Sequence, residues 1–281
     1  VSIMIASAAS KQNFFAMASK LLVEFAWMLA AILVSLVIRL GWMDKATGEE
    51  KVDTVETEDP AQEKVRKGLR LYVPILLLSF IIISLRIAFI PNSLLNIIFP
   101  PVLLLFTVFQ GWTLFRYRKA LPHWDVIYGW ISLLVLVATT VIAFKGYVLL
   151  GVQLLIWWIF LLTILQSITA VYDLLYIYYV RHIKKTKENY IEEHPNLPNK
   201  SNEDLIAVTW PHSFVKQALL PIAIVLAIPF SLYMASSVFD LNGVYHQYYN
   251  YPFLNLEGYI SLSLSKIIMV VVLFFLFRYL V

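Results

Sequence analysis

The chain has 281 residues, of which 60% are hydrophobic and only 14% are charged. A soluble domain carries about a quarter charged residues, so this composition argues against a soluble enzyme and favours a protein embedded in lipid. The absence of cysteine excludes disulfides, thiolate metal sites and cysteine nucleophiles. The net charge of +4 does not indicate nucleic-acid binding, because membrane topology accounts for the excess cations.

Seven apolar runs follow one another along the chain, and a helix needs roughly 20 such residues to cross a bilayer. Because no water is present at membrane depth, backbone groups must pair within their own segment, which selects helices. The fifth run is too long for the hydrocarbon core alone and should tilt or project beyond it. The predicted spans are 14–38, 72–90, 94–115, 126–144, 147–180, 214–238 and a run from about 259 to 281.

Polar segments and turns divide these spans into units. Short turns at 91–93 and Lys145-Gly146 join neighbouring spans, and an aromatic loop is expected over 239–259. The predicted fold is therefore an all-α membrane protein of about seven transmembrane helices, mostly stacked helical hairpins. Its units are the first span (1–39), a charged linker (40–71), a hairpin (72–115), a hairpin with a long inner extension (116–180), a polar segment (181–213) and a last hairpin (214–281).

Both long polar segments carry signals of local structure. The linker could become helical after Pro60, since proline suits the first turn of a helix. In the second segment, Pro195, Pro198 and Pro211 act as helix breakers. Between these prolines, Ser201 or Asn202 could cap a short helix that runs through residues 206–208.

The basic residues predict an orientation. Seventeen of the 22 Lys and Arg residues fall into alternate connections or next to the last residues, at 39–70, 116–119, 181–216 and Arg278. Short loops rich in Lys and Arg face the cytoplasm. We therefore expect the N-terminus outside and the C-terminal end at the cytoplasmic face, in a bacterial inner membrane.

Four charged residues lie inside or near the edges of spans: Glu24, Arg86, Asp173 and Lys266. A charge at mid-membrane costs roughly 2.5–3.5 kcal/mol on insertion scales, so each needs a partner, a wet cavity or a snorkelling route. Arg86 could snorkel, and Asp173 could lie in water near the inner end of its helix. Glu24 could pair with Lys266 or Arg86, contact lipid head groups, or line an ion or substrate path.

Prolines and basic runs supply further candidates. Pro221 and Pro229 predict kinks in the sixth span, which either bend the helix or expose carbonyl groups to a cation. Two cytoplasmic runs could bind anionic lipid in addition to fixing topology. The residues of these runs are Arg116, Arg118 and Lys119 in the first, and Arg181, Lys184 and Lys185 in the second.

No motif predicts catalysis. The histidines do not cluster, His123-Trp124-Asp125 has no second group beside it in sequence, and HExxH and GxSxG are absent. We therefore expect no enzyme activity and no cofactor or metal. A secondary transporter or receptor-like bundle remains the alternative function, and it predicts inverted repeats with a polar site at the midplane.

The C-terminal quarter, about residues 216–281, carries a resemblance. Its pattern runs from Leu219-Leu220-Pro221 through Pro229 and Phe239-Asp240-Leu241, then through Pro252-Phe253 and 261–266 to Leu276-Phe277-Arg278-Tyr279. It resembles the segment before the pore in large bacterial mechanosensitive channels of the small-conductance (MscS-like) family.

The resemblance implies the sensor region of a tension-gated ion channel used in osmotic protection. It also implies a ring-shaped homo-oligomer, a heptamer, with membrane lipids as partners. The pore-lining helix and the cytoplasmic vestibule of that family would follow Val281, so the chain is expected to be part of a longer protein. The resemblance therefore assigns no pore-lining residue to this chain.

Overall fold

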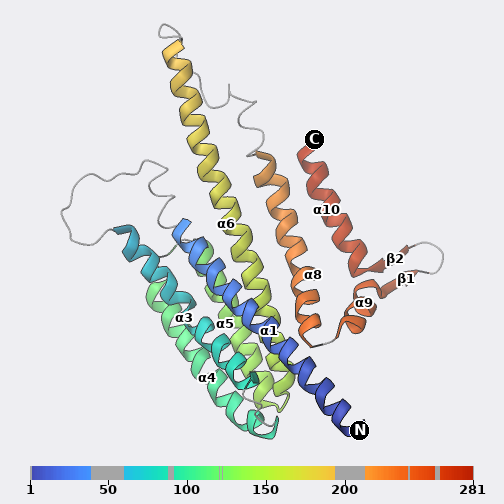
Figure 1. The fold of residues 1–281 in the computed structure, drawn as a ribbon. Coiled ribbons are helices and arrows are strands. Elements are labelled where there is room, and N and C mark those ends of the chain that lie inside the picture. Colours follow the sequence, from blue (N-terminus) through green and yellow to red (C-terminus); the bar gives the residue numbers. More distant parts are fainter. Residues whose placement is uncertain are drawn as a thin grey trace.

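The structure is a computed structural model, and it describes residues 2–38, 60–87, 92–119, 121, 123–193, 213–239, 241–256 and 260–280. Helices dominate this part of the chain (Figure 1). The elements are α1 (Ser2–Leu36), α3 (Pro60–Ile87), α4 (Asn92–Tyr117), α5 (His123–Phe144), α6 (Val148–Glu193), a π-helix (Val215–Leu219), α8 (Leu220–Val238), α9 (Asn242–Asn250), β1 (Pro252–Leu256), β2 (Ile260–Ser263) and α10 (Leu264–Leu280).

Within these residues, five helical stretches are long and apolar enough to cross a membrane. The protein is accordingly a helical membrane protein. Most of the predicted second span lies in α3. The predicted last span begins as β2 and continues as α10. Neither helix is among the five, so the total of seven remains a prediction. The five stretches are Ala18–Leu36, Asn96–Tyr117, His123–Phe144, Val148–His182 and Val215–Val238.

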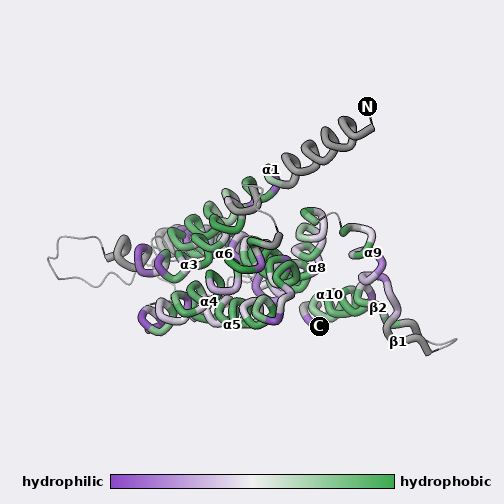
Figure 2. The backbone as a smooth tube through the Cα atoms, turned by 90° about the horizontal axis from the view of Figure 1, so that it is seen from below, coloured by the Kyte–Doolittle hydropathy of each residue, from purple (hydrophilic) through white to green (hydrophobic). Residues whose placement is uncertain are grey.

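The helices alternate in direction. The starts of α3 and α8 and the ends of α6 and α10 point to the top of Figure 1, whereas the N-terminal end of α1 points to the bottom. Seen from below in Figure 2, α3, α6 and α8 lie in one row and α4, α5 and α10 in a second, with α1 across the first row. The long helix α6 is central, because it packs against α1, α5 and α8.

Burial supports this central position. In the span of α6, 56% of the residues are buried inside the protein, compared with 28% in the spans of α1 and α8. The helices α1, α3, α4, α5 and α6 enclose a common core, since each packs against the next and α6 closes back on α1. The last helix, α10, lies outside this group and packs against α8, the π-helix, α9 and β2.

The sequence of α5 explains its packing. Its buried residues recur every three or four positions, which places them on one face of a helix. Small and hydroxyl side chains on that face let the neighbouring helices approach closely, as is typical in membranes. At Gly129 a Cβ atom would lie 2.7 Å from Leu114 Cδ1 of α4, so a larger residue here would force the Leu114 side chain to shift.

Two predicted local features are confirmed. Helix α3 begins at Pro60, where the missing N–H costs no hydrogen bond. The turn at Lys145-Gly146 joins α5 to α6, and Gly146 has a φ of 91°, which favours glycine.

The prolines of the sixth span differ from one another. A π-helix at Val215–Leu219 lies directly before Pro221, and the Leu220 N–H bonds to the Val215 carbonyl. This widened turn relieves the clash of a proline ring with the preceding turn. Pro229 lies inside α8 and is buried.

Other predictions agree with the structure only in part. The membrane stretch of α6, Val148–His182, agrees with the predicted fifth span, but the helix itself continues to Glu193 and projects past its neighbours in Figure 1. The expected loop at 239–259 contains the helix α9 and the start of an antiparallel hairpin of β1 and β2, in which Leu254 pairs with Leu262. The predicted short helix at 201–208 and most of the linker lie outside the described residues.

Candidate functional site

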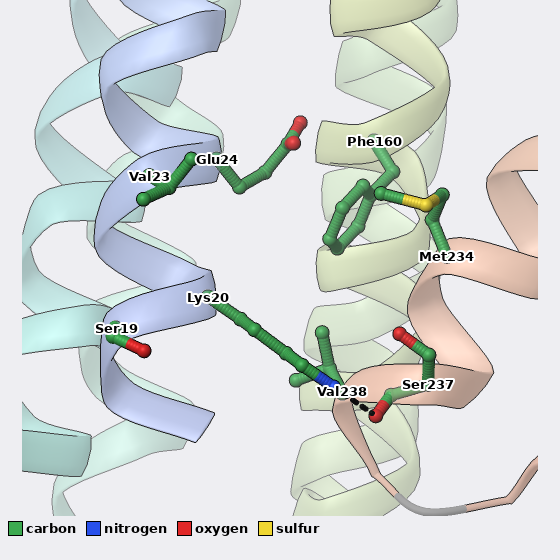
Figure 3. A pocket seen from close by; sticks show the side chains of 8 residues that line it. All are labelled: Ser19, Lys20, Val23, Glu24, Phe160, Met234, Ser237 and Val238. Carbon is green, nitrogen blue, oxygen red and sulfur yellow. Dashed lines mark hydrogen bonds between the residues drawn. The ribbon is translucent and has the colours of Figure 1, made fainter. Parts of the chain in front are cut away.

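A pocket of about 280 Å³ lies where α1, α6 and α8 meet (Figure 3). One face of α1 supplies half of its lining, because the four residues recur at helical spacing. Apolar side chains from α6 and α8 form much of the opposite wall. The lining residues are Ser19, Lys20, Val23, Glu24, Phe160, Met234, Ser237 and Val238.

Two opposite charges enter this pocket from α1. Lys20 Nζ donates to the Ser237 carbonyl at 3.4 Å, so a cation lies at the C-terminal turn of α8, where carbonyl groups lack helical partners. Glu24 lies one turn further along and points toward α6 (Figure 3). Its carboxyl group is half-buried beside Thr163, and Oε1 has no hydrogen-bond partner.

Of the other predicted intramembrane charges, Lys266 and Asp173 do not line this pocket. Lys266 is exposed on α10, so its predicted pairing with Glu24 remains untested. Arg86 lies near the end of α3, and its side chain is outside the described part. Asp173, for which a position in water was one possibility, is only 6% exposed, because α6 packs among its neighbours at this position.

A buried polar network connects three helices near the start of α5. The Tyr72 hydroxyl of α3 donates to Asp125 Oδ1 at 2.6 Å. Gln166 Nε2 of α6 donates to the same hydroxyl at 2.9 Å. All three side chains are buried, and each bond is strong in a low-dielectric interior.

The sequence motif His123-Trp124-Asp125 contains Asp125 but does not predict this network. A sequence pattern could have indicated the network. Asp125 lies at the start of a span, and two further polar residues of that span, Ser132 and Thr139, follow it at intervals of seven residues. Such spacing places all three on one helix face. Ser132 indeed accepts a hydrogen bond from Trp158 Nε1 of α6 at 3.1 Å.

A similar bond ties α8 to the central helix. Trp157 Nε1 of α6 donates to Ser231 Oγ at 3.0 Å, and Ser231 in turn donates to the Ile228 carbonyl of its own helix. Polar side chains inside a membrane protein are expected to find partners in this way.

The two basic runs predicted to bind anionic lipid differ in their side-chain contacts. Arg116 lies over Trp112 and Arg118 lies over Phe115, with guanidinium-to-ring distances of 5.9 and 5.3 Å. Lys119 is exposed beside them. Arg181 and Lys185 are exposed on α6, and the side chain of Lys184 is outside the described set.

At the opposite end, α9 closes against α8 through aromatic residues. The Tyr245 hydroxyl donates to the Pro229 carbonyl at 3.1 Å, so this carbonyl is engaged by the protein. Burial, together with Tyr249 and Tyr233, raises the pKa of Tyr245. The Tyr245 hydroxyl therefore keeps its proton, and remains a hydrogen-bond donor, at pH values above the usual pKa of a phenol.

Among the described residues, no group of three or more His, Asp or Glu could hold a metal ion. The fold and these sites define a polytopic helical membrane protein with a buried polar core and a charged pocket. No family model, curated protein or solved structure matches the chain.

Proposed function

We propose that the chain is the membrane-embedded, lipid-contacting sensor region of a tension-gated ion channel that protects bacteria from osmotic stress. In this proposal the protein is an MscS-like channel of the inner membrane. Seven spans run from an external N-terminus to a cytoplasmic C-terminal end, and the subunits form a homo-oligomer, a heptamer.

One observation carries the proposal: α8 and α10 extend from the five-helix group with large apolar side chains uncovered. Phe230 of α8 is 53% exposed, and Met269 and Phe274 of α10 are 63% and 59% exposed. In a membrane, lipid tails or neighbouring subunits would cover such surfaces. They lie in the segment that resembles the part of those channels before the pore.

The physical basis is the work done by membrane tension, which equals the tension multiplied by the change in in-plane area. A helix pair attached along one side of a group can move with the surrounding lipid, and here α8 packs against α6 while α10 packs against α8. A shift in its position would then change the area that the assembly occupies.

Patch-clamp recording of the full-length protein in a membrane under suction tests the proposal. We expect channel openings whose probability rises with applied pressure. Solute transport driven by an ion gradient, without pressure-dependent current, would instead support the alternative of a secondary transporter.

A further inference from the structure

Two arginines converge on one phenol oxygen at the basic end of α3 and α4. Arg70 Nη1 of α3 donates to Tyr117 Oη at 3.1 Å, and its guanidinium lies 5.9 Å from the centre of the Tyr117 ring. Arg116 of α4 also lies close to this hydroxyl. Two positive charges from different helices are thus held next to the same oxygen.

Among the side chains that the structure describes, no carboxylate contacts either of these arginines. Both guanidinium groups are exposed, and within the described residues their contacts are Tyr117 and, for Arg116, also the Trp112 ring. Neighbouring like charges repel one another, and an anion that touches both would remove this cost. The Tyr117 hydroxyl accepts from Arg70 and can still donate its own proton to such an anion.

An apolar stripe leads away from Arg116 along α4. Leu105, Val108 and Trp112 are 64%, 65% and 58% exposed. Their spacing to one another and to Arg116 places all four on one helix face. The stripe lies within the predicted span and could carry an acyl chain, whereas a free anion would make no use of it.

We propose that Arg70, Arg116 and Tyr117 bind the phosphate of an anionic phospholipid whose acyl chain lies along Leu105, Val108 and Trp112. Guanidinium groups suit this role because they bind phosphate oxygens in pairs. Their contacts with Trp112 and Tyr117 hold them in place before the lipid arrives. This inference deepens the lipid-contacting part of the proposed function and rests on membrane embedding, not on gating.

Arg118 provides a matched control. It belongs to the same helix end and is exposed, but it lies over Phe115, which packs edge-on against Trp130 of α5. Removal of Arg118 therefore changes the net charge equally without changing the pair that converges on Tyr117.

The test is native mass spectrometry of the full chain in detergent, titrated with phosphatidylglycerol or with phosphatidylcholine. We expect phosphatidylglycerol to bind preferentially. Arg116→Gln and Arg70→Gln should each weaken its binding by about fivefold, as expected for the loss of one cation near a membrane surface. Arg118→Gln should leave binding within about twofold of the original protein, a smaller loss than removal of one such contact would give.

Three outcomes would overturn the proposal: equal losses for Arg116→Gln and Arg118→Gln, equal binding of the two lipids, or displacement of the lipid by inorganic phosphate at similar concentrations. Arg116→Lys keeps the charge, and we expect partial retention, so it replaces Arg116→Gln if that variant fails to fold. Pressure-dependent currents do not enter this test, so failure of the lipid site and failure of the channel proposal are distinguishable.

Discussion

Glu24 places a carboxyl group in a half-buried pocket, and its Oε1 atom has no hydrogen-bond partner. A charged carboxylate at such a position is poorly solvated, whereas a neutral amide costs less to bury. We therefore expect Glu24→Gln to leave the thermal midpoint of the detergent-solubilised protein unchanged or to raise it.

The same variant tests the predicted ion pair with Lys266. If Glu24 formed that pair in the membrane, removal of its charge would leave Lys266 without compensation and lower stability, by about 1 kcal/mol or more. Lys266→Gln would then give a similar loss, and the combined variant would lose less than the sum of the two single losses.

The buried hydroxyl group of Tyr72 is expected to stabilise the protein. Tyr72→Phe removes the hydroxyl group that joins Asp125 to Gln166 while preserving most of the apolar volume. The loss should be about 1–3 kcal/mol in unfolding free energy, because buried polar groups lose a partner. Chemical denaturation followed by tryptophan fluorescence measures the change.

Tyr128→Phe is the matched control for this measurement. The Tyr128 hydroxyl lies 3.2 Å from Thr169 Oγ1, and Thr169 still has the Leu165 carbonyl as a partner when that hydroxyl is removed. We expect a smaller effect for Tyr128→Phe. Equal losses for the two variants would mean that the hydrogen bonds of the Tyr72 hydroxyl stabilise the protein no more than the contact of the Tyr128 hydroxyl does.

At the scale of elements, the turn between α5 and α6 depends on the conformation of one residue. Gly146 has a φ of 91°, and a Cβ atom there would meet no neighbour within 4 Å. Gly146→Ala should therefore destabilise the protein through backbone strain alone, by about 1–2 kcal/mol. Gly243→Ala in α9, where the added Cβ also finds open space, should leave stability equal or slightly higher.

The apolar runs predicted the membrane helices well, since a long hydrophobic segment without water has few alternatives to a helix. The residues of α5, and those of the π-helix together with α8, match the predicted spans to within a few positions. The helix α9 was missed because its Tyr-rich sequence lacks an apolar stripe, and its position depends on contacts such as that of Tyr245 with Pro229. Burial of Asp173 and Asp125 likewise depends on which helices become neighbours, which the order of spans alone does not define.

At the scale of the whole molecule, the two ends of the helix assembly carry different types of side chain. Basic residues gather at one end: Arg70 in the first half of α3, Lys216 in the π-helix before α8, Arg116 and Arg278 in the last turns of α4 and α10, and Arg181 in the last third of α6. The opposite end carries the turn at Gly146 and the aromatic residues of α9. Because the helices alternate in direction, one labelling result at each end defines the orientation of every element.

The orientation can be measured directly because the chain has no cysteine. Lys145 and Lys185 are both exposed and lie at opposite ends of the assembly, before the start and near the end of α6. In intact cells, a membrane-impermeant maleimide should label Lys145→Cys and should reach Lys185→Cys only after the membrane is permeabilised. The basic residues predict this result because they remain on the cytoplasmic side. Labelling of Lys185→Cys in intact cells would reverse the orientation and place the Arg70–Arg116 site in the outer leaflet.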